Sequence, residues 1–254
     1  MTNTSDLNGR VVLVTGASSG LGRYFATLLA GRGAVVIAAA RRREALDALT
    51  REIGAGGGIC HPLVMDVSDA ASVEEGFGRA IEVAGRLDVL INNAGVAQTR
   101  AALDQSAEEW RATLEPNLTG AFLAAQAAAR LMRDAGGGGI VNVASILGER
   151  VSKGLAAYAA SKAGLIQLTK ALALEWAAIG VRVNALAPGY IETDLNREFF
   201  ASESGRRLIG RIPQQRLGQM SDLDGPLLLL CSDASRYMTG SVIAVDGGHL
   251  VNSL

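Results

Sequence analysis

The stretch "VVLVTGASSGLG", residues 11 to 22, decides the fold. An apolar segment of strand character runs directly into three glycines, Gly16, Gly20 and Gly22, and a helical pattern begins near residue 21. Such glycines let the backbone approach a pyrophosphate, and the N-terminus of the following helix attracts its negative charge. The stretch therefore predicts a dinucleotide-binding loop, contacted also through Ser18, Ser19 and Leu21. A plain strand-to-helix turn is the alternative.

Apolar, β-branched segments recur along the chain and alternate with helical patterns. The expected strands lie in the segments 10–15, 34–40, 58–67, 86–95, 139–145, 181–189 and 241–248. The expected helices are 21–31, 43–53, 69–84, 106–133, 155–178 and 222–231, with Ser68 and Ser106 as caps and an irregular stretch at 192–221. This alternation predicts an α/β fold: a single Rossmann-type, doubly wound domain over 1–254, with a seven-stranded parallel sheet and helices on both faces.

Composition argues against several classes of ligand and location. A net charge of -1 argues against nucleic acid, since a phosphate backbone is bound mainly by clustered cations. Cys60 and Cys231 lie far apart without CxxC spacing, and no His, Asp or Glu spacing suggests a metal, so neither a disulfide framework nor a metal site is expected. The N-terminus has no signal-peptide pattern and no long apolar run follows, which predicts a cytoplasmic protein outside the membrane.

The end of the second expected strand bears on cofactor choice. An NAD enzyme usually carries an acidic residue there, but this chain has Ala40 followed by Arg41. An arginine can bind a 2′-phosphate through charge-assisted hydrogen bonds, so the sequence predicts that NADP(H) is preferred and NAD(H) possible. Alternatively, 41–43 is the solvated first turn of a helix, which suits Arg42 and Arg43 better than Arg41.

Polar residues follow two further strands at the edge where ligands bind in open parallel sheets. Asp66 and Val67 follow the third strand, and the fourth ends in "NNAG", which adds Asn93, Ala94 and Gly95 to the predicted cofactor site. Asp66 alone could equally be a turn or helix-capping residue.

The segment "AAYAASKAG", residues 156 to 164, contains two long titratable side chains among small ones. Tyr158 and Lys162 are four residues apart, so they lie on one helical face. A neighbouring ammonium favours the phenolate and should lower the pKa of Tyr158, which would let the phenol exchange a proton with a carbonyl or alcohol oxygen near neutral pH. The small alanines leave space for a cofactor beside the pair.

The order and spacing of these motifs resemble the short-chain dehydrogenase/reductase family over nearly the whole chain: "TGASSGLG", "NNAG", "PNLTG", the serine of "VNVASILG", "YAASK" and "APGYIETD". The resemblance implies that Tyr158 is the general acid/base, that Ser145 binds the substrate oxygen, that Lys162 also holds the nicotinamide ribose, and that Asn117 positions a proton-relaying water. It also implies cofactor contacts from the last motif, through Pro188, Gly189, Ile191 and Thr193. Pro116 departs from the usual family pattern and should sharpen a bend.

The resemblance implies an NADPH-dependent carbonyl reductase, similar to 3-oxoacyl-thioester reductases, that acts on a small-molecule ketone. A dehydrogenase of a sugar, polyol or steroid alcohol is the alternative, and a non-catalytic dinucleotide sensor is a third possibility that the residues Asn117, Ser145, Tyr158 and Lys162 weigh against. Substrate choice should lie in 146–155, Tyr190 and a lid at about 190–215. Because the family is usually tetrameric, a homotetramer is expected.

Overall fold

Seven parallel strands form one sheet in the computed structural model, which describes residues 7–192 and 197–252. The strand order is β3-β2-β1-β4-β5-β6-β7, so the direction of winding reverses between β1 and β4. The strands are β1 (Val11–Thr15), β2 (Val35–Ala40), β3 (Ile59–Val64), β4 (Val89–Asn92), β5 (Gly138–Val143), β6 (Val181–Pro188) and β7 (Val242–Val245). The predicted seven-stranded parallel sheet is confirmed.

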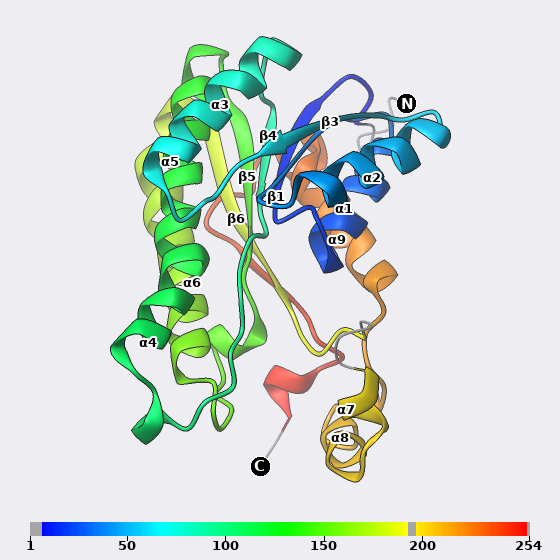
Figure 1. Ribbon diagram of the computed structural model, residues 1–254, viewed down its shortest axis with the longest axis vertical. Helices are drawn as coiled ribbons and strands as arrows, with labels where there is room; N and C mark the ends of the chain where they lie inside the picture. The colour runs from blue at the N-terminus through cyan, green and yellow to red at the C-terminus, as the bar shows by residue number, and fades with distance from the viewer. Residues whose placement is uncertain (1–6, 193–196, 253–254) are drawn as a thin grey trace.

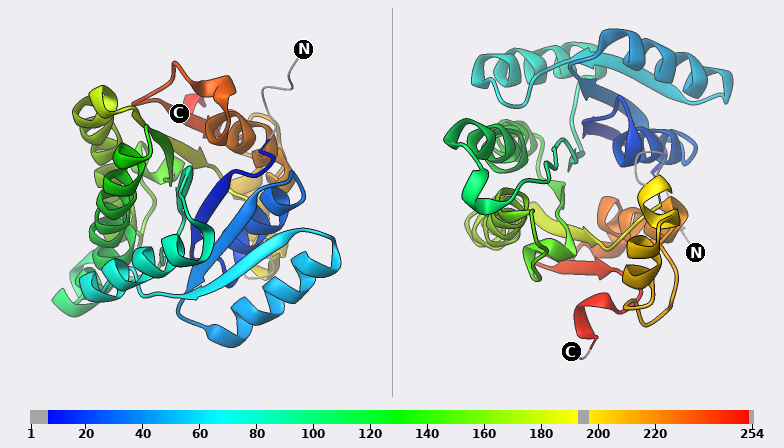
Figure 2. Two further views of the ribbon diagram at one scale, coloured as in Figure 1. Left: turned by 90° about the horizontal axis from the view of Figure 1, so that it is seen from above. Right: turned by 60° about the horizontal axis from the view of Figure 1, so that its bottom comes forward.

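Helices cover both faces of the sheet (Figures 1 and 2). One face packs against α1 (Gly20–Ala30), α2 (Arg43–Ala55) and α9 (Asp224–Cys231). The opposite face packs against α3 (Ala70–Ala84), α5 (Gly120–Asp134) and α6 (Ala156–Trp176). This is the doubly wound arrangement that the alternating pattern predicted, because right-handed crossovers on either side of the switch point place helices on opposite faces.

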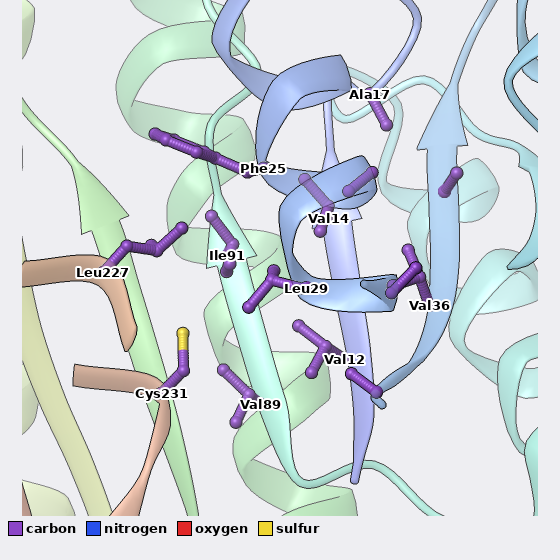
Figure 3. Packing of buried hydrophobic residues seen from close by; sticks show 14 of the residues in the cluster. Val12, Val14, Ala17, Phe25, Leu29, Val36, Val89, Ile91, Leu227 and Cys231 are labelled. Atoms are coloured by element: carbon purple, nitrogen blue, oxygen red, sulfur yellow. The ribbon is translucent and has the colours of Figure 1, made fainter. Parts of the chain in front are cut away.

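The strands are apolar at almost every position because both faces of the sheet are buried. Val12 and Val14 of β1 face α1, where Phe25 and Leu29 cover them (Figure 3). The alternate residue Leu13 points the other way, into the second core cluster. That cluster contains four alanines of α5, whose small side chains let the helix approach the sheet closely: Ala124, Ala125, Ala128 and Ala129.

The helix expected over 106–133 is divided by a π-helical turn. The chain forms α4 (Ala107–Leu114), then the turn η2 (Glu115–Thr119), then α5. Pro116 has no N–H with which to continue the α-helical hydrogen-bond pattern, and the N–H of Gly120 bonds to the carbonyl of Glu115, five residues back. The turn carries Asn117 into the interior, where its side chain is fully buried.

The structure corrects two expectations about local structure. Ser106 caps α4 through a reciprocal pair with Glu109, as expected, but α3 is capped by Asp69, whose carboxylate accepts the N–H of Ala71, and not by Ser68. The stretch 192–221, expected to be irregular, contains α7 (Arg197–Ala201), α8 (Glu203–Ile209) and the short turn η5 (Met220–Leu223). The remaining helices begin and end within a few residues of the expected bounds.

Candidate active site

The glycine-rich loop is tied to the end of β4. The Thr15 hydroxyl accepts the N–H groups of Asn93 and Ala94, both at 3.0 Å, and donates to the carbonyl of Ile91 at 3.3 Å. The Asn93 amide in turn donates to the Thr15 carbonyl at 3.0 Å. Because the strand order reverses between β1 and β4, these bonds fix the two walls of the crevice in which open α/β sheets bind ligands.

The three glycines of the loop have different roles. A Cβ on Gly16 would lie 2.8 Å from the Ala94 Cα, and one on Gly22 would lie 2.4 Å from the Gly16 carbonyl, so both positions require the close approach that glycine allows. Gly20 has a φ of +54°, and a Cβ there would meet open space. Gly20 also begins α1, and the Ser19 side chain does not cap that helix.

A dinucleotide fits this loop. The first N–H groups of α1 have no side-chain cap, and the space above Gly20 would admit a pyrophosphate against the positive end of the helix. A cavity of about 710 Å³ lies over the loop. Its lining includes these predicted cofactor residues: Gly16, Ser18, Ser19, Gly20, Leu21, Arg41, Asp66, Val67, Asn93, Ala94 and Gly95. Gly22 packs beneath the loop instead.

Arg42, which the alternative interpretation of 41–43 placed in a solvated first turn, contacts the loop. Its guanidinium donates to the hydroxyls of Ser18 and Ser19, each at 2.9 Å, and it lines the cavity beside Arg41. Arg41 is largely exposed, with a guanidinium nitrogen 3.9 Å from a carboxylate oxygen of Asp66. The pairing of β1 with β2 was the available signal, since it places the residues after β2 beside the loop after β1.

Asp66 has a local structural role as well as a place in the cavity wall. One carboxylate oxygen accepts the N–H of Ser68 at 2.9 Å, and the Asp66 N–H donates to the Ser72 hydroxyl at 3.0 Å. These bonds shape the turn that leads into α3, which is the alternative that the sequence left open for this residue.

A second cavity, of about 300 Å³, adjoins the first and shares Leu21, Asn93 and Gly95 with it. The structure brings together here six residues predicted from separate motifs: Ser145, Tyr158, Lys162, Pro188, Gly189 and Ile191. Tyr190 also lines this cavity. Thr193, the remaining predicted cofactor residue, lies outside the described residues.

Lys162 is buried beside Tyr158. The two side chains occupy one face of α6, with the Lys162 Nζ 5.7 Å from the centre of the Tyr158 ring. The ammonium donates to the Val143 carbonyl at 2.7 Å, and it is only 5% exposed. Burial lowers the pKa of Lys162 to about 8, because a charged ammonium is poorly solvated there.

Tyr158 does not have the lowered pKa that the sequence predicted. Burial raises its pKa, and this effect outweighs the hydrogen bond from Ser145, which lowers it; Tyr190 raises it further. A pKa above the ordinary value means that the phenol is neutral at pH 7. The neutral phenol is the form that can donate a proton to a carbonyl oxygen.

Asn117 holds three parts of the site together. Its side-chain oxygen accepts the Val96 N–H at 2.7 Å, and its amide donates to the Val96 carbonyl at 2.9 Å and to the Ser161 hydroxyl at 3.0 Å. These bonds join the π-helical turn, the loop after β4 and α6. A Cβ on Gly95 would lie 3.0 Å from the Asn117 oxygen and 3.7 Å from the Lys162 Nζ, so the three residues adjoin closely.

Residues 7–192 and 197–252 contain neither a metal-binding cluster nor a membrane-spanning helix. Within these ranges, no three His, Cys, Asp or Glu side chains gather in a way that could hold a metal ion. In the same part of the chain, none of the helices combines the length and apolar character needed to cross a membrane.

Comparison with known proteins identifies the class. The family model described as enoyl-(acyl carrier protein) reductase matches residues 16–249. A 3-oxoacyl-(acyl-carrier-protein) reductase of Thermotoga maritima is 39% identical over 96% of this chain and 99% of its own length. The D-threitol dehydrogenase of Mycolicibacterium smegmatis is 37% identical over 96% of this chain and 94% of its own.

A solved structure agrees with these relatives. The gluconate 5-dehydrogenase of Burkholderia cenocepacia, crystallised with NADP and tartrate, is 35% identical, covers 99% of both chains and superposes with a TM-score of 0.94. Fold, site and relatives together define an NAD(P)(H)-dependent oxidoreductase that acts on alcohol and carbonyl groups. The chain belongs to the short-chain dehydrogenase/reductase family.

Proposed function

We propose that the protein is an NADPH-dependent carbonyl reductase in which Tyr158 is the general acid/base. One observation carries the proposal: Ser145, Tyr158 and Lys162 converge on a cavity that adjoins the glycine-loop cavity. The cofactor, when bound, supplies the hydride. The chain supplies orientation and the proton.

The proposed cofactor contacts follow from the lining of the two cavities. The N-terminus of α1 and the loop 16–22 receive the pyrophosphate, and Arg41 and Arg42 receive the 2′-phosphate. The end of β2 has Ala40 where a carboxylate would repel that phosphate. A relative that is 35% identical was crystallised with NADP, which supports NADP(H) as the preferred cofactor. We propose NAD(H) as a weaker alternative.

The catalytic roles follow from protonation and position. Ser145 and the neutral Tyr158 phenol hydrogen-bond the substrate oxygen, and Tyr158 donates its proton as negative charge develops there. The nearby Lys162 ammonium then stabilises the phenolate that remains. Asn117 joins α6 to the loop after β4 through its side-chain hydrogen bonds. We propose that it also positions the water that relays a proton to Lys162.

We propose a 3-oxoacyl thioester as the substrate class, as in the 39% identical reductase. The alternative, oxidation of a sugar or polyol, draws support from the 37% identical D-threitol dehydrogenase. Measuring NADPH consumption separates the two. The substrates are a short 3-oxoacyl thioester and a panel of simple ketones, diketones and sugars, each measured also with NADH as the paired cofactor. Turnover of the thioester well above the panel would support our proposal. Turnover restricted to sugars or polyols, in either direction, would contradict it.

Four further features are proposed with this function. Residues 1–254 form one domain, and the segment at about 190–215 closes over the substrate: Tyr190 packs against Phe200, with ring centres 5.8 Å apart, and Phe200 against Phe199 at 5.1 Å. The enzyme is a cytoplasmic homotetramer. Sedimentation as a monomer at micromolar concentration would contradict the assembly, and fractionation of the source cells checks the location.

A further inference from the structure

A large cavity lies at the edge of the sheet opposite to the active site. The strands β1, β4, β5 and β6 end at the catalytic groove. The residues at or just before the start of each of these strands line the cavity on the opposite side: Arg10, Asp88, Gly138 and Val181. Its volume is about 900 Å³. Gly136 and Gly137 before β5, Gly138 at its first position and Gly180 before β6 leave this part of the lining without side chains. None of the proposed catalytic or cofactor residues belongs to it.

The cavity carries an excess of positive charge. Four arginines and two aspartates line it. Arg10 pairs with Asp233 at 2.5 Å, and Arg86 pairs with Asp88. These pairs neutralise both carboxylates and leave Arg182 and Arg236. Arg236 is exposed, and within the described part of the chain its guanidinium forms no ion pair or hydrogen bond.

Arg182 is a half-buried cation held by neutral groups. Its guanidinium donates to the Ser235 hydroxyl at 2.8 Å and to the Leu230 carbonyl at 3.3 Å, and no carboxylate among the described residues bonds to it. Burial is the largest effect and lowers the pKa of Arg182; Arg10 lowers it further, while Cys231 and Asp233 nearby raise it without reversing the direction. Withdrawing a guanidinium from water without a bonded anion costs free energy, and an anion that enters beside it offsets much of this cost.

We infer that this cavity binds a small phosphate-bearing anion, a phosphate monoester or a diphosphate, through Arg182 and Arg236. A phosphate monoester carries about -1.5 to -2 charges at neutral pH, which matches the two arginines that the aspartates leave unpaired. The planar guanidinium presents paired donors to phosphate oxygens. The Tyr237 ring, fully exposed in the same wall, offers a flat face to an organic group on the phosphate.

Calorimetric titration of inorganic pyrophosphate into the full-length protein tests this site. The protein is first saturated with NADP⁺, so that the catalytic groove does not compete for the anion. We expect one pyrophosphate bound per chain, with affinity that falls as salt is raised. Substituting Arg236→Ser or Arg182→Met should weaken binding at least about tenfold, because each removes a charge-assisted contact.

Arg51→Ser is the matched control, since Arg51 is an exposed arginine on α2, outside both cavities. It should bind pyrophosphate as tightly as the unsubstituted protein. Arg236→Ser keeps the test decisive if Arg182→Met fails to fold, because the Arg236 side chain makes no bond that the substitution would remove and serine keeps its backbone bond to Asp233. Absence of binding, or binding that Arg236→Ser leaves as tight as Arg51→Ser does, would overturn the inference.

Discussion

Arg42 and Arg41 differ in how firmly they are placed beside the cofactor groove. Arg42 is held by two serine hydroxyls of the loop, whereas Arg41 extends into solvent near Asp66. A cation that is already positioned loses less conformational entropy when it binds a 2′-phosphate. We therefore predict that Arg42→Ala raises the KM for NADPH at least about tenfold and that Arg41→Ala has a smaller effect.

The KM for NADH is the internal reference, because NADH has no 2′-phosphate. It should change by less than about twofold in both variants. Arg43→Ala is a matched control, since Arg43 pairs with Asp47 and does not line the groove. Equal KM changes for the two cofactors, or a larger change for Arg43→Ala, would contradict the assignment.

The buried Lys162 ammonium makes stability depend on pH. Its pKa is about 8 in the folded chain against an ordinary value of 10.5, so the unfolded chain binds more protons between these values. Its burial therefore destabilises the fold below pH 8, and this cost is relieved as pH rises from 8 toward 10.5. We predict that the free energy of unfolding of the cofactor-free protein rises by about 1 kcal/mol between pH 8 and 9 from this group.

Urea unfolding of the wild type and Lys162→Met across this interval checks the prediction. The difference between the two slopes isolates Lys162, because the buried thiols Cys60 and Cys231, whose pKa values are raised, are present in both proteins. Those thiols lower stability above about pH 9 and so act in the opposite sense. Parallel pH profiles for the two proteins would contradict a buried, cationic Lys162.

At the scale of single elements, α4 depends on its capping box. The Ser106 hydroxyl accepts the Glu109 N–H at 3.1 Å, and the Glu109 carboxylate accepts the Ser106 N–H at 2.9 Å. Ser106→Ala should lower the free energy of unfolding by about 1 kcal/mol, because it removes the side-chain acceptor. Ser68→Ala is the control, because Ser68 contributes only its backbone N–H to the turn before α3. This substitution should lower the free energy of unfolding by less than about 0.5 kcal/mol. Denaturant titration measures both variants.

The strands were predictable because they are buried on both faces and so read as continuous apolar runs. Contacts between residues far apart in the sequence were harder to predict. Pro116 indicated a bend, but the π-helical turn also requires Asn117 to reach the Val96 backbone, a contact between residues 21 apart. Ser68 and Asp69 are both good capping residues, and sequence alone did not decide which of them contacts the first turn of α3.

The site was predictable where a motif fixes local geometry. Tyr158 and Lys162 share a helical face whatever the surroundings, and the loop from Gly16 to Gly22 needs glycine for reasons within the loop and its nearest neighbours. The pKa of Tyr158 was not predictable, since it depends on how much water the assembled site excludes. The position of Arg42 depends on the pairing of β1 with β2, which the residues at 41–43 do not reveal alone.

Across the whole molecule, parallel strands bring distant motifs to one edge. The groove takes residues from the loops after β1, β2, β3, β4, β5 and β6, together with the face of α6 that carries Tyr158. The α4, α7 and α8 helices gather at the end of the molecule toward which β6 runs (Figure 1). The winding of the sheet therefore builds the active site, and the small residues around Tyr158 leave it open.

The most direct test of the account is the rate of NADPH oxidation with a short 3-oxoacyl thioester for the wild type and Tyr158→Phe, measured beside NADPH binding by fluorescence. Loss of the phenolic proton should lower kcat by about 10²- to 10⁴-fold, while the Kd for NADPH stays within about twofold. Tyr24→Phe should match the wild type, because Tyr24 bonds to Asp224 and lines neither cavity of the groove. Undiminished turnover by Tyr158→Phe would contradict the assignment of Tyr158 as the proton donor.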